Sequence, residues 1–428
     1  MMTLETPEEK ISAAEARFDQ LRKRVGLFAG PLFGLFIYLL PLPLDPNAHK
    51  MAALMVGTVI FWITEPIPIP VTALLAPMLA ILFGLGKAKE VLAGFGHPVL
   101  FMFIGSFLIA RSMQLHHLDR RFSFALLSLP WVCRSPQRVL ATLGTITAFL
   151  SMWISNTAAT AMIFPIALGI LGTLQSNSEK TATPSYATGM MLMISFAASI
   201  GGIGTPIGTP PNLIGIGLIG EQLGKKISFF EWMQLGVPLL LVMYLALYFL
   251  LATLHRSHAI SLSGVTDFIQ KQKQGLGPWT LAQKNTLGVF ITAISLWVMP
   301  GILAVFLGSD SEWVRFYEER MPNDTVAVMA ASLLFFLPKD WKKQEFTLSW
   351  KEGVEIDWGT ILLFGGGIVL GELMFKTGLS KAVGEGLFAL LAIESLWGVT
   401  ALAILMGIVI SELSSNTASA TMIVPVVI

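Results

Sequence analysis

The chain has 428 residues, of which 54% are hydrophobic and only 13% are charged, and its mean hydropathy is +0.70. Soluble domains carry about a quarter charged residues, so this composition indicates an all-α polytopic membrane protein. The formal net charge of +1 argues against a nucleic-acid partner. The single Cys133 excludes an intrachain disulfide and a cysteine metal cluster.

The predicted elements begin with a charged segment and continue as apolar spans long enough to cross a bilayer. Residues 1–24 are predicted to form a cytoplasmic amphipathic helix, and residues 25–47 the first transmembrane helix. Further spans are predicted at about 48–66, 69–86, 98–115, 185–219 (interrupted), 235–254, 286–307, 323–338 and 358–375. Residues 255–285 are predicted to be a polar cytoplasmic linker.

Two more apolar segments, at about 137–174 and 395–428, are each broken in the middle by the triplet Ser-Asn-Thr. The triplets are Ser155-Asn156-Thr157 and Ser415-Asn416-Thr417, and the sequence around them matches as well. Polar side chains and broken helices are unfavourable at membrane depth unless they line a cavity or lie inside the protein. We therefore expect each segment to form a re-entrant helical hairpin with its triplet at the tip.

The similarity between the two halves extends upstream, where Gly105 pairs with Gly366. We expect inverted repeats, repeat one over 48–254 and repeat two over 286–428. Repeat two should be incomplete, because Ile428 lies inside the second arm of its hairpin. Lys and Arg are about twice as frequent in the connections that share a side with the N-terminus, which predicts a cytoplasmic N-terminus.

A third polar interruption, Gly201–Gly215, lies in the span after the first hairpin, and its Gly and Pro residues predict an unwound segment. Gly204 can offer a carbonyl to a cation. At a hairpin tip, the carboxyl end of one helix favours cations and the amino end of the next favours anions. The predicted pocket is formed by the two triplets and this interruption, and it contains no Lys or Arg. Bound Na⁺ would therefore balance the charge of an anionic substrate. The stretch Gly365–Gly371 is predicted to be a helix-packing stripe, because no phosphate-loop Lys follows it.

The triplets, the stretch TEPIPIPVTALL (Thr64–Leu75) and the stretch GTPIGTPPN (Gly204–Asn212) resemble the divalent-anion:sodium symporter family. The resemblance covers nearly the whole chain from about residue 25. It implies a homodimer and an elevator-type transporter, in which a transport domain holding both hairpins moves across the membrane. It also implies sodium as the co-transported ion, and no enzyme activity.

The resemblance implies two sodium sites and a substrate site. The first sodium site would use Ser151, Ser155, Asn156 and Gly204, and the second Ser411, Ser414 and Asn416. The substrate would contact Asn156, Thr157, Thr205, Pro206, Asn416 and Thr417.

These features predict a sodium-coupled symporter of C4-dicarboxylates such as succinate, malate or fumarate, in a bacterial-type inner membrane. Two alternatives within the same family are a sulfate:sodium symporter and a dicarboxylate exchanger. A membrane channel is the alternative from another class, since re-entrant hairpins occur there too. We find no nucleophile elbow, metalloprotease histidine pair or kinase signature that would indicate an enzyme.

Overall fold

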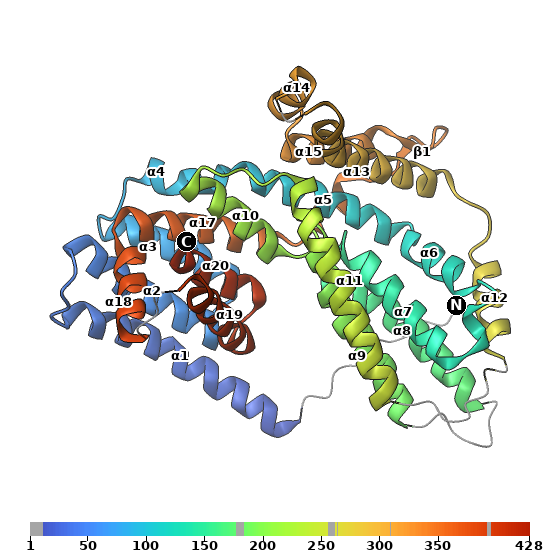
Figure 1. Cartoon of the computed structure of the whole chain (residues 1–428), viewed down its shortest axis with the longest axis horizontal. Coiled ribbons are helices and arrows are strands. Elements are labelled where there is room, and N and C mark those ends of the chain that lie inside the picture. The colour runs from blue at the N-terminus through green and yellow to red at the C-terminus, as the bar shows by residue number, and fades with distance from the viewer. Residues whose placement is uncertain (1–11, 177–183, 256–261, 263, 309, 392–394) are drawn as a thin grey trace. The chain divides into compact units, whose positions relative to one another are not determined.

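The computed structural model describes residues 12–176, 184–255, 262, 264–308, 310–391 and 395–428. These residues are almost entirely helical, with one short β-hairpin (Figure 1). They form two compact units. The first contains the chain up to His97, Gly217–Gly224 and Trp358–Ile428, and the second contains Pro98–Ile216 and Lys225–Asp357. Each unit therefore takes segments from both predicted repeats.

The first unit is built from the two ends of the chain. Its core lies where α2, α3, α17 and α20 pack together, around side chains such as Met51, Trp62 and Met422. The unit also receives the last turns of α10 (Pro210–Leu223). Its own elements are α1 (Ala13–Leu39), α2 (Pro46–Thr64), α3 (Ile69–Leu82), α4 (Ala88–Ala93), η1 (Gly94–Gly96), α17 (Trp358–Lys376), α18 (Leu379–Leu391), α19 (Leu396–Leu413) and α20 (Asn416–Val427).

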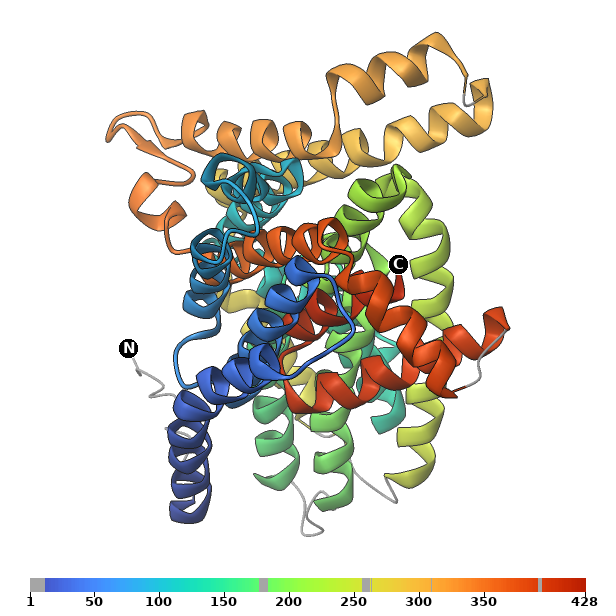
Figure 2. The same cartoon turned by 90° about the vertical axis from the view of Figure 1, so that its left-hand side faces the viewer.

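The second unit has its core among α7, α8, α9, α11 and α12. Its elements are α5 (Pro98–Leu115), α6 (Leu118–Leu127), η2 (Val132–Arg134), α7 (Pro136–Ser151), α8 (Asn156–Ser176), α9 (Pro184–Gly201), η3 (Gly202–Gly204), most of α10, α11 (Phe229–Leu254), α12 (Val265–Gly275), α13 (Leu281–Leu307), α14 (Glu312–Arg320), α15 (Asn323–Phe336), the antiparallel strands β1 (Pro338–Asp340) and β2 (Glu345–Phe346), and α16 (Trp350–Gly353). Figure 2 shows α13, α14 and α15 in gold and orange, with the β-hairpin following α15.

Local sequence signals explain where several helices begin and end. Capping boxes, in which a Ser or Thr and the residue three positions later satisfy each other's backbone NH groups, start α1, α11 and α13. Helix α2 ends at Glu65, which adopts the left-handed conformation (φ 49°) of a helix carboxyl cap. The chain therefore turns between α2 and α3 at this residue.

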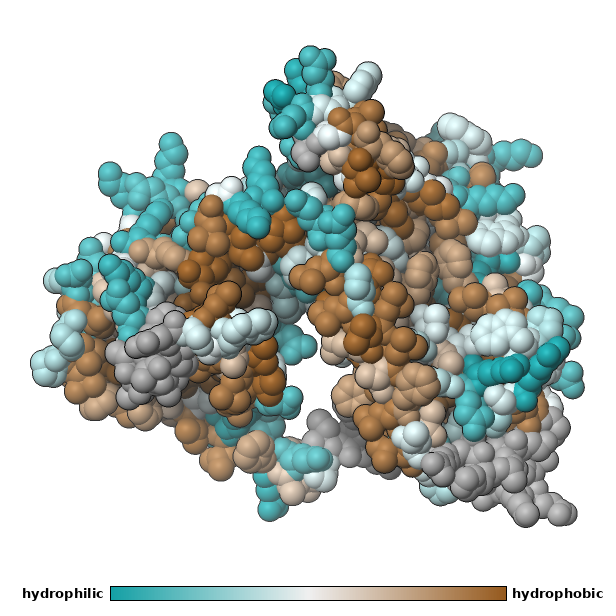
Figure 3. Space-filling view, viewed as in Figure 1, coloured by the Kyte–Doolittle hydropathy of each residue, from teal (hydrophilic) through white to brown (hydrophobic). Residues whose placement is uncertain are grey.

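The apolar helices have the length and the surface of a membrane protein. Within the described residues, seven helices are long and apolar enough to span a bilayer. Figure 3 shows apolar side chains over the outward face of α11, where Leu235, Val242 and Phe249 are exposed. Exposed apolar surface of this extent belongs in lipid.

The structure corrects three details of the predicted elements. Helix α1 is one continuous helix from Ala13 to Leu39, across the expected boundary at residue 25. No helix-breaking residue stands at that boundary, and Gly26 and Gly30 are instead the buried positions where α1 packs. The predicted linker 255–285 contains α12 and the start of α13, and its residues 256–261 and 263 lie outside the described residues. The connection 337–349 forms a β-hairpin that the sequence did not predict.

Candidate functional site

The first Ser-Asn-Thr triplet breaks a helix at the predicted place. Helix α7 ends at Ser151, and α8 begins at Asn156. Between them the backbone NH groups of Trp153 and Ile154 donate to the Leu150 carbonyl, which closes the last turn of α7. Ser155 caps α8, since its hydroxyl accepts from the Ala158 NH at 3.3 Å. The carboxyl end of one helix and the amino end of the next therefore meet at one tip.

The second triplet breaks a helix in the same manner. Helix α19 ends at Leu413, and α20 begins at Asn416. Ser415 caps α20, with its hydroxyl accepting from the Ala418 NH at 3.2 Å. The corresponding serine thus caps the second helix in both copies, and the helix break expected at each triplet is confirmed.

The serines that precede the triplets are used differently in the two copies. The buried Ser151 hydroxyl reaches across the break and donates to Asn156 Oδ1 at 2.8 Å. The Ser411 hydroxyl instead donates to the Ile408 carbonyl of its own helix at 3.0 Å. Within the described residues, the buried Ser414 hydroxyl has no hydrogen-bond partner. An unpaired buried hydroxyl is unfavourable.

The unwound segment after α9 lies against the first tip. Helix α9 passes into the short helix η3, and extended backbone at Thr205 interrupts the span before α10. The Thr205 hydroxyl donates to the Met152 carbonyl in the tip. Asn212 Nδ2 donates to the Gly202 and Thr205 carbonyls, each at 2.8 Å, and so holds the segment closed. The predicted unwinding of this span is confirmed.

Glycine allows the segment to approach the tip closely. A Cβ on Gly202 would lie 2.5 Å from Asn156 Oδ1. A Cβ on Gly208 would lie 2.6 Å from the Gly202 carbonyl oxygen and 3.0 Å from the Ser151 carbonyl oxygen. Several oxygen acceptors therefore converge beside the tip, and any larger residue at these positions would displace them.

The structure brings together most residues predicted for the first sodium site. Ser151 bonds Asn156, and the segment that contains Gly204 contacts the tip. A Cβ on Gly204 would meet Met152 at 3.1 Å, and the Gly204 carbonyl oxygen lies 3.4 Å from where a Cβ on Gly236 of α11 would stand. Ser155 is exposed, and its hydroxyl is engaged as the cap of α8.

The predicted substrate residues fall in both compact units. In the second unit, Thr205 and Pro206 are buried, while Thr157 is exposed in the first turn of α8. In the first unit, Asn416 is exposed and Thr417 is half-buried in the first turn of α20. The two triplets thus belong to different units.

Two side chains that the sequence interpretation did not select support the unwound segment. Asn212 makes the two hydrogen bonds described above, and Trp232 Nε1 of α11 donates to the Ile203 carbonyl at 2.9 Å. A polar Asn in an apolar span was the available signal for Asn212. No sequence signal identified Trp232, because its partner is a backbone carbonyl distant in the sequence.

The chemistry of the first tip suits a small hard cation. Its converging groups are neutral hydroxyl, amide and carbonyl oxygens, the ligand type that broken helices offer to Na⁺. Within the described residues, no cluster of three or more His, Cys, Asp or Glu side chains could hold a metal. A cation at the tip would therefore depend on these neutral oxygens.

The glycine stripe of α17 packs helices, as predicted. A Cβ on Gly366 would lie 2.2 Å from the Ala73 carbonyl oxygen of α3, and one on Gly367 would lie 2.5 Å from Thr421 Cγ2 of α20. Helix α17 thereby approaches α3 and supports the arm that follows the second triplet.

Comparison with known proteins assigns the family. A family profile described as the sodium:sulfate symporter transmembrane region matches residues 21–428. A sodium-dependent dicarboxylate transporter of Staphylococcus saprophyticus is 32% identical over 410 residues, covering 94% of this chain and 77% of that protein. A sodium-dependent dicarboxylate transporter of Staphylococcus aureus is 31% identical over 415 residues, with the same two shares. The chain is therefore a multi-pass membrane transporter, not an enzyme, and it belongs to the sodium:sulfate symporter family, the divalent-anion:sodium symporters.

Proposed function

We propose that this protein is a sodium-coupled symporter of C4-dicarboxylates such as succinate, malate and fumarate. The observation that carries the proposal is the pair of helix breaks at Ser155 and Ser415, each capped by its serine. The two relatives named above are described as sodium-dependent dicarboxylate transporters, which supports this substrate class over sulfate.

In this proposal, sodium binds before the dicarboxylate. At the first site Na⁺ is held by Ser151, Ser155, Asn156 and Gly204, and at the second by Ser411, Ser414 and Asn416. The substrate carboxylates then meet Asn156, Thr157, Asn416 and Thr417, with Thr205 and Pro206 nearby. None of these residues carries a formal charge, so bound Na⁺ and the amino ends of α8 and α20 supply the positive potential that a dianion needs.

The proposed transport mechanism is an elevator built on inverted repeats. One packing motif occurs twice. A Cβ on Gly105 of α5 would lie 2.3 Å from the Ala327 carbonyl carbon of α15. A Cβ on Gly366 of α17 would lie 2.2 Å from the Ala73 carbonyl oxygen of α3. In each pair, a helix of one repeat packs on a helix of the other. This exchange supports an internal duplication, with the two hairpins as corresponding parts.

The proposed setting is an inner membrane, with a cytoplasmic N-terminus and a homodimeric assembly. The orientation rests on the twofold excess of Lys and Arg in connections on the side of the N-terminus. The homodimer rests on the family resemblance.

Uptake of labelled succinate into proteoliposomes tests the function. With the full-length protein, an inward Na⁺ gradient should drive uptake that an equal K⁺ gradient does not. Asn156→Ala should abolish this uptake, because it removes an oxygen at the first tip, whereas Thr160→Ala, one turn further along α8, should retain it. Equal uptake in Na⁺ and K⁺ would contradict sodium coupling, and wild-type uptake by Asn156→Ala would contradict the site.

The same vesicles separate the alternatives. Unlabelled sulfate should compete poorly with labelled succinate. If sulfate is the better competitor, the protein is a sulfate:sodium symporter. Uptake that needs internal dicarboxylate and ignores Na⁺ would indicate an exchanger. Flux that does not saturate and shows no counterflow would indicate a channel.

A further inference from the structure

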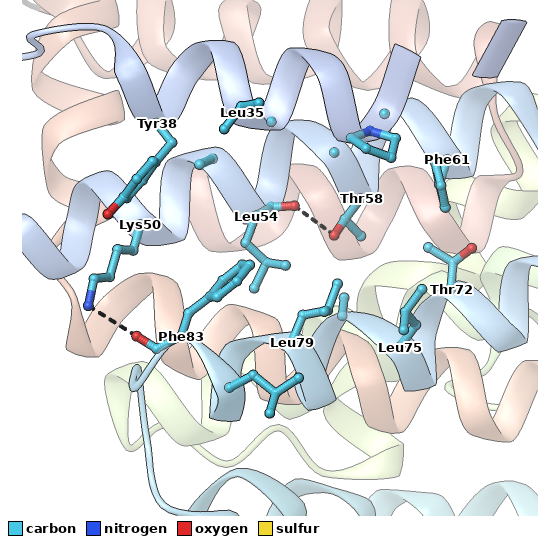
Figure 4. A pocket seen from close by; sticks show the side chains of 17 residues that line it. Leu35, Tyr38, Lys50, Leu54, Thr58, Phe61, Thr72, Leu75, Leu79 and Phe83 are labelled. Carbon is cyan, nitrogen blue, oxygen red and sulfur yellow. Dashed lines mark hydrogen bonds between the residues drawn. The ribbon is translucent and has the colours of Figure 1, made fainter. Parts of the chain in front are cut away.

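An apolar cavity of about 680 Å³ lies between α1, α2 and α3, entirely within the first unit. Figure 4 shows its side chains. Most are aliphatic or aromatic, and they include Leu35, Leu54, Phe61, Leu75, Leu79 and Phe83.

Close packing of α1 on α2 creates this cavity. A Cβ on Gly34 would lie 3.0 Å from the Ala53 carbonyl oxygen, and one on Gly57 would lie 3.3 Å from the Gly30 carbonyl oxygen. These glycines bring the two backbones into contact and also line the cavity. Because they carry no side chains, little from α1 or α2 fills the space beside α3.

The two ends of the cavity differ in polarity. Tyr38 and Lys50 lie at one end, where Lys50 Nζ donates to the Phe83 carbonyl at 3.1 Å (Figure 4). Within the described residues, no carboxylate lies within ion-pair distance of Lys50. Thr58 lines the wall further in, and its hydroxyl is satisfied by the Leu54 carbonyl at 2.8 Å. The cavity thus has a cationic end and a mostly apolar body, in which Thr72 contributes one buried hydroxyl without a hydrogen-bond partner among the described residues.

The surroundings of the cavity are those of a lipid-facing surface. Several lining side chains are exposed, with exposed fractions of 54% for Leu35, 52% for Tyr38 and 78% for Leu82. The neighbouring Phe28 and Leu32 of α1 are exposed too, at 73% and 64%. In a membrane protein such a surface faces acyl chains, and an apolar cavity that opens there fills with hydrocarbon rather than water.

The volume matches one acyl chain. A methylene group takes about the room of a water molecule, ~30 Å³, so the cavity holds on the order of twenty methylenes. A single chain of a common phospholipid is of this length. With that chain in the cavity, the headgroup lies at the Lys50 end, where an ammonium without a carboxylate partner favours a phosphate.

We propose that this cavity is a binding site for one anionic phospholipid, with an acyl chain between α1, α2 and α3 and the headgroup phosphate at Lys50. The site is separate from the triplets and does not depend on the transported substrate. Tyr38, beside Lys50, places an amphipathic ring at the headgroup level, as is common at membrane interfaces.

Native mass spectrometry of the delipidated full-length protein tests the proposal, with phosphatidylglycerol and phosphatidylcholine of identical acyl chains as probes. The wild type should retain one tightly bound phosphatidylglycerol. Lys50→Gln should lower the preference for phosphatidylglycerol by about fivefold, the contribution of one lysine at an anionic surface. Lys87→Gln, which removes an exposed lysine that does not line the cavity, should leave the preference unchanged.

A second pair of variants tests the acyl chain. Leu75→Trp should fill the cavity and weaken both lipids, whereas Val71→Trp, one turn earlier on α3 and outside the lining, should weaken neither. These two positions have similar exposed fractions of 40% and 47%. The proposal is overturned if Lys50→Gln keeps the lipid preference, or if Leu75→Trp retains the lipid. It is also overturned if Leu75→Trp changes the oligomeric state, since a second copy of the chain would then occupy the groove.

Discussion

At the residue scale, a single amide determines the shape of the unwound segment. Asn212 is 8% exposed and donates to the backbone carbonyls of Gly202 and Thr205. Its contribution is conformational, because it closes residues 202–205 into a turn beside Asn156. The helix breaks at the two triplets could be predicted from the sequence. Asn212 could not, since its partners become apparent only when the span unwinds.

Replacing Asn212 by Ala should both destabilise the protein and weaken sodium dependence. Loss of Nδ2 removes both hydrogen bonds, at about 0.5–1.5 kcal/mol each. Thermal unfolding in detergent and the Na⁺ concentration for half-maximal uptake measure the two effects. Asn285→Ala is the matched control, because Asn285 Nδ2 also makes two bonds, to the Pro338 carbonyl at 3.0 Å and Thr347 Oγ1 at 2.9 Å. If both variants shift the Na⁺ requirement equally, Asn212 has no special role at the site.

The buried Asp119 in the first turn of α6 should make stability depend on pH. Burial raises the pKa of this carboxyl, and its Oδ1 has no hydrogen-bond partner. In the unfolded chain the pKa of this carboxyl is about 3.9. As the pH rises above that pKa, the unfolded chain ionises first, and the folded state loses stability relative to it. Above the folded pKa the loss is complete and constant.

Asp119→Asn should therefore raise the melting temperature at pH 7, and the gain should shrink as pH falls toward 4. Differential scanning fluorimetry across this range measures it. Asp267→Asn is the control, since Asp267 is an exposed acid in the first turn of α12 and should give no gain. A gain at pH 7 that persists unchanged at pH 4 would assign the effect to something other than ionisation.

At the element scale, hydrophobic length and polar interruptions predicted most of the long helices. The spans at 98–115, 323–338 and 358–375 agree with α5, α15 and α17 within a few residues. The elements that were missed are short and amphipathic or polar, namely α4, α6, α12, α14 and α18 and the β-hairpin. These follow span ends, where hydropathy carries little information and the local fold depends on what each segment packs against.

Glycine-to-alanine changes should show which helix crossings are tight. Gly105→Ala and Gly366→Ala place a Cβ 2.3 and 2.2 Å from backbone atoms of a facing helix. Each should destabilise by about 1–3 kcal/mol, since a backbone cannot move aside as a side chain can. Gly288→Ala on α13, where a Cβ meets nothing within 4 Å, should instead stabilise by about 0.5–1 kcal/mol. The three variants are compared by their melting temperatures in detergent. An unchanged melting temperature for Gly366→Ala would show that α17 and α3 are further apart than described.

At the scale of the whole molecule, the arrangement of the helices does not follow chain order. The compact units each combine parts of both proposed repeats, with α3 beside α17 in the first and α5 beside α15 in the second. The similarity between the two halves of the sequence does not reveal this arrangement, because it does not show which helix packs on which.

Cysteine labelling tests the proposed membrane topology. Cys133 is the natural cysteine of the chain and is replaced first, so that it does not contribute to the labelling. Burial raises the pKa of its thiol, so it should react slowly at neutral pH. In a Cys133→Ser background, Lys89→Cys should react with an impermeant maleimide from outside the cell, and Gln272→Cys only after permeabilisation. Both positions are exposed. The reverse pattern would place the N-terminus outside.

The sequence by itself determined the membrane class, most of the long helices, the two helix breaks and the resemblance that the comparisons confirm. These follow from local physics, since apolar length, caps and broken helices are written into consecutive residues. Only the tertiary structure decided that Asn212 hydrogen-bonds across the unwound segment, that α3 packs on α17 and α5 on α15, and that α1, α2 and α3 leave a cavity ending at Lys50. Each of these depends on contacts between residues distant in the chain, and hydropathy and motifs do not record such contacts.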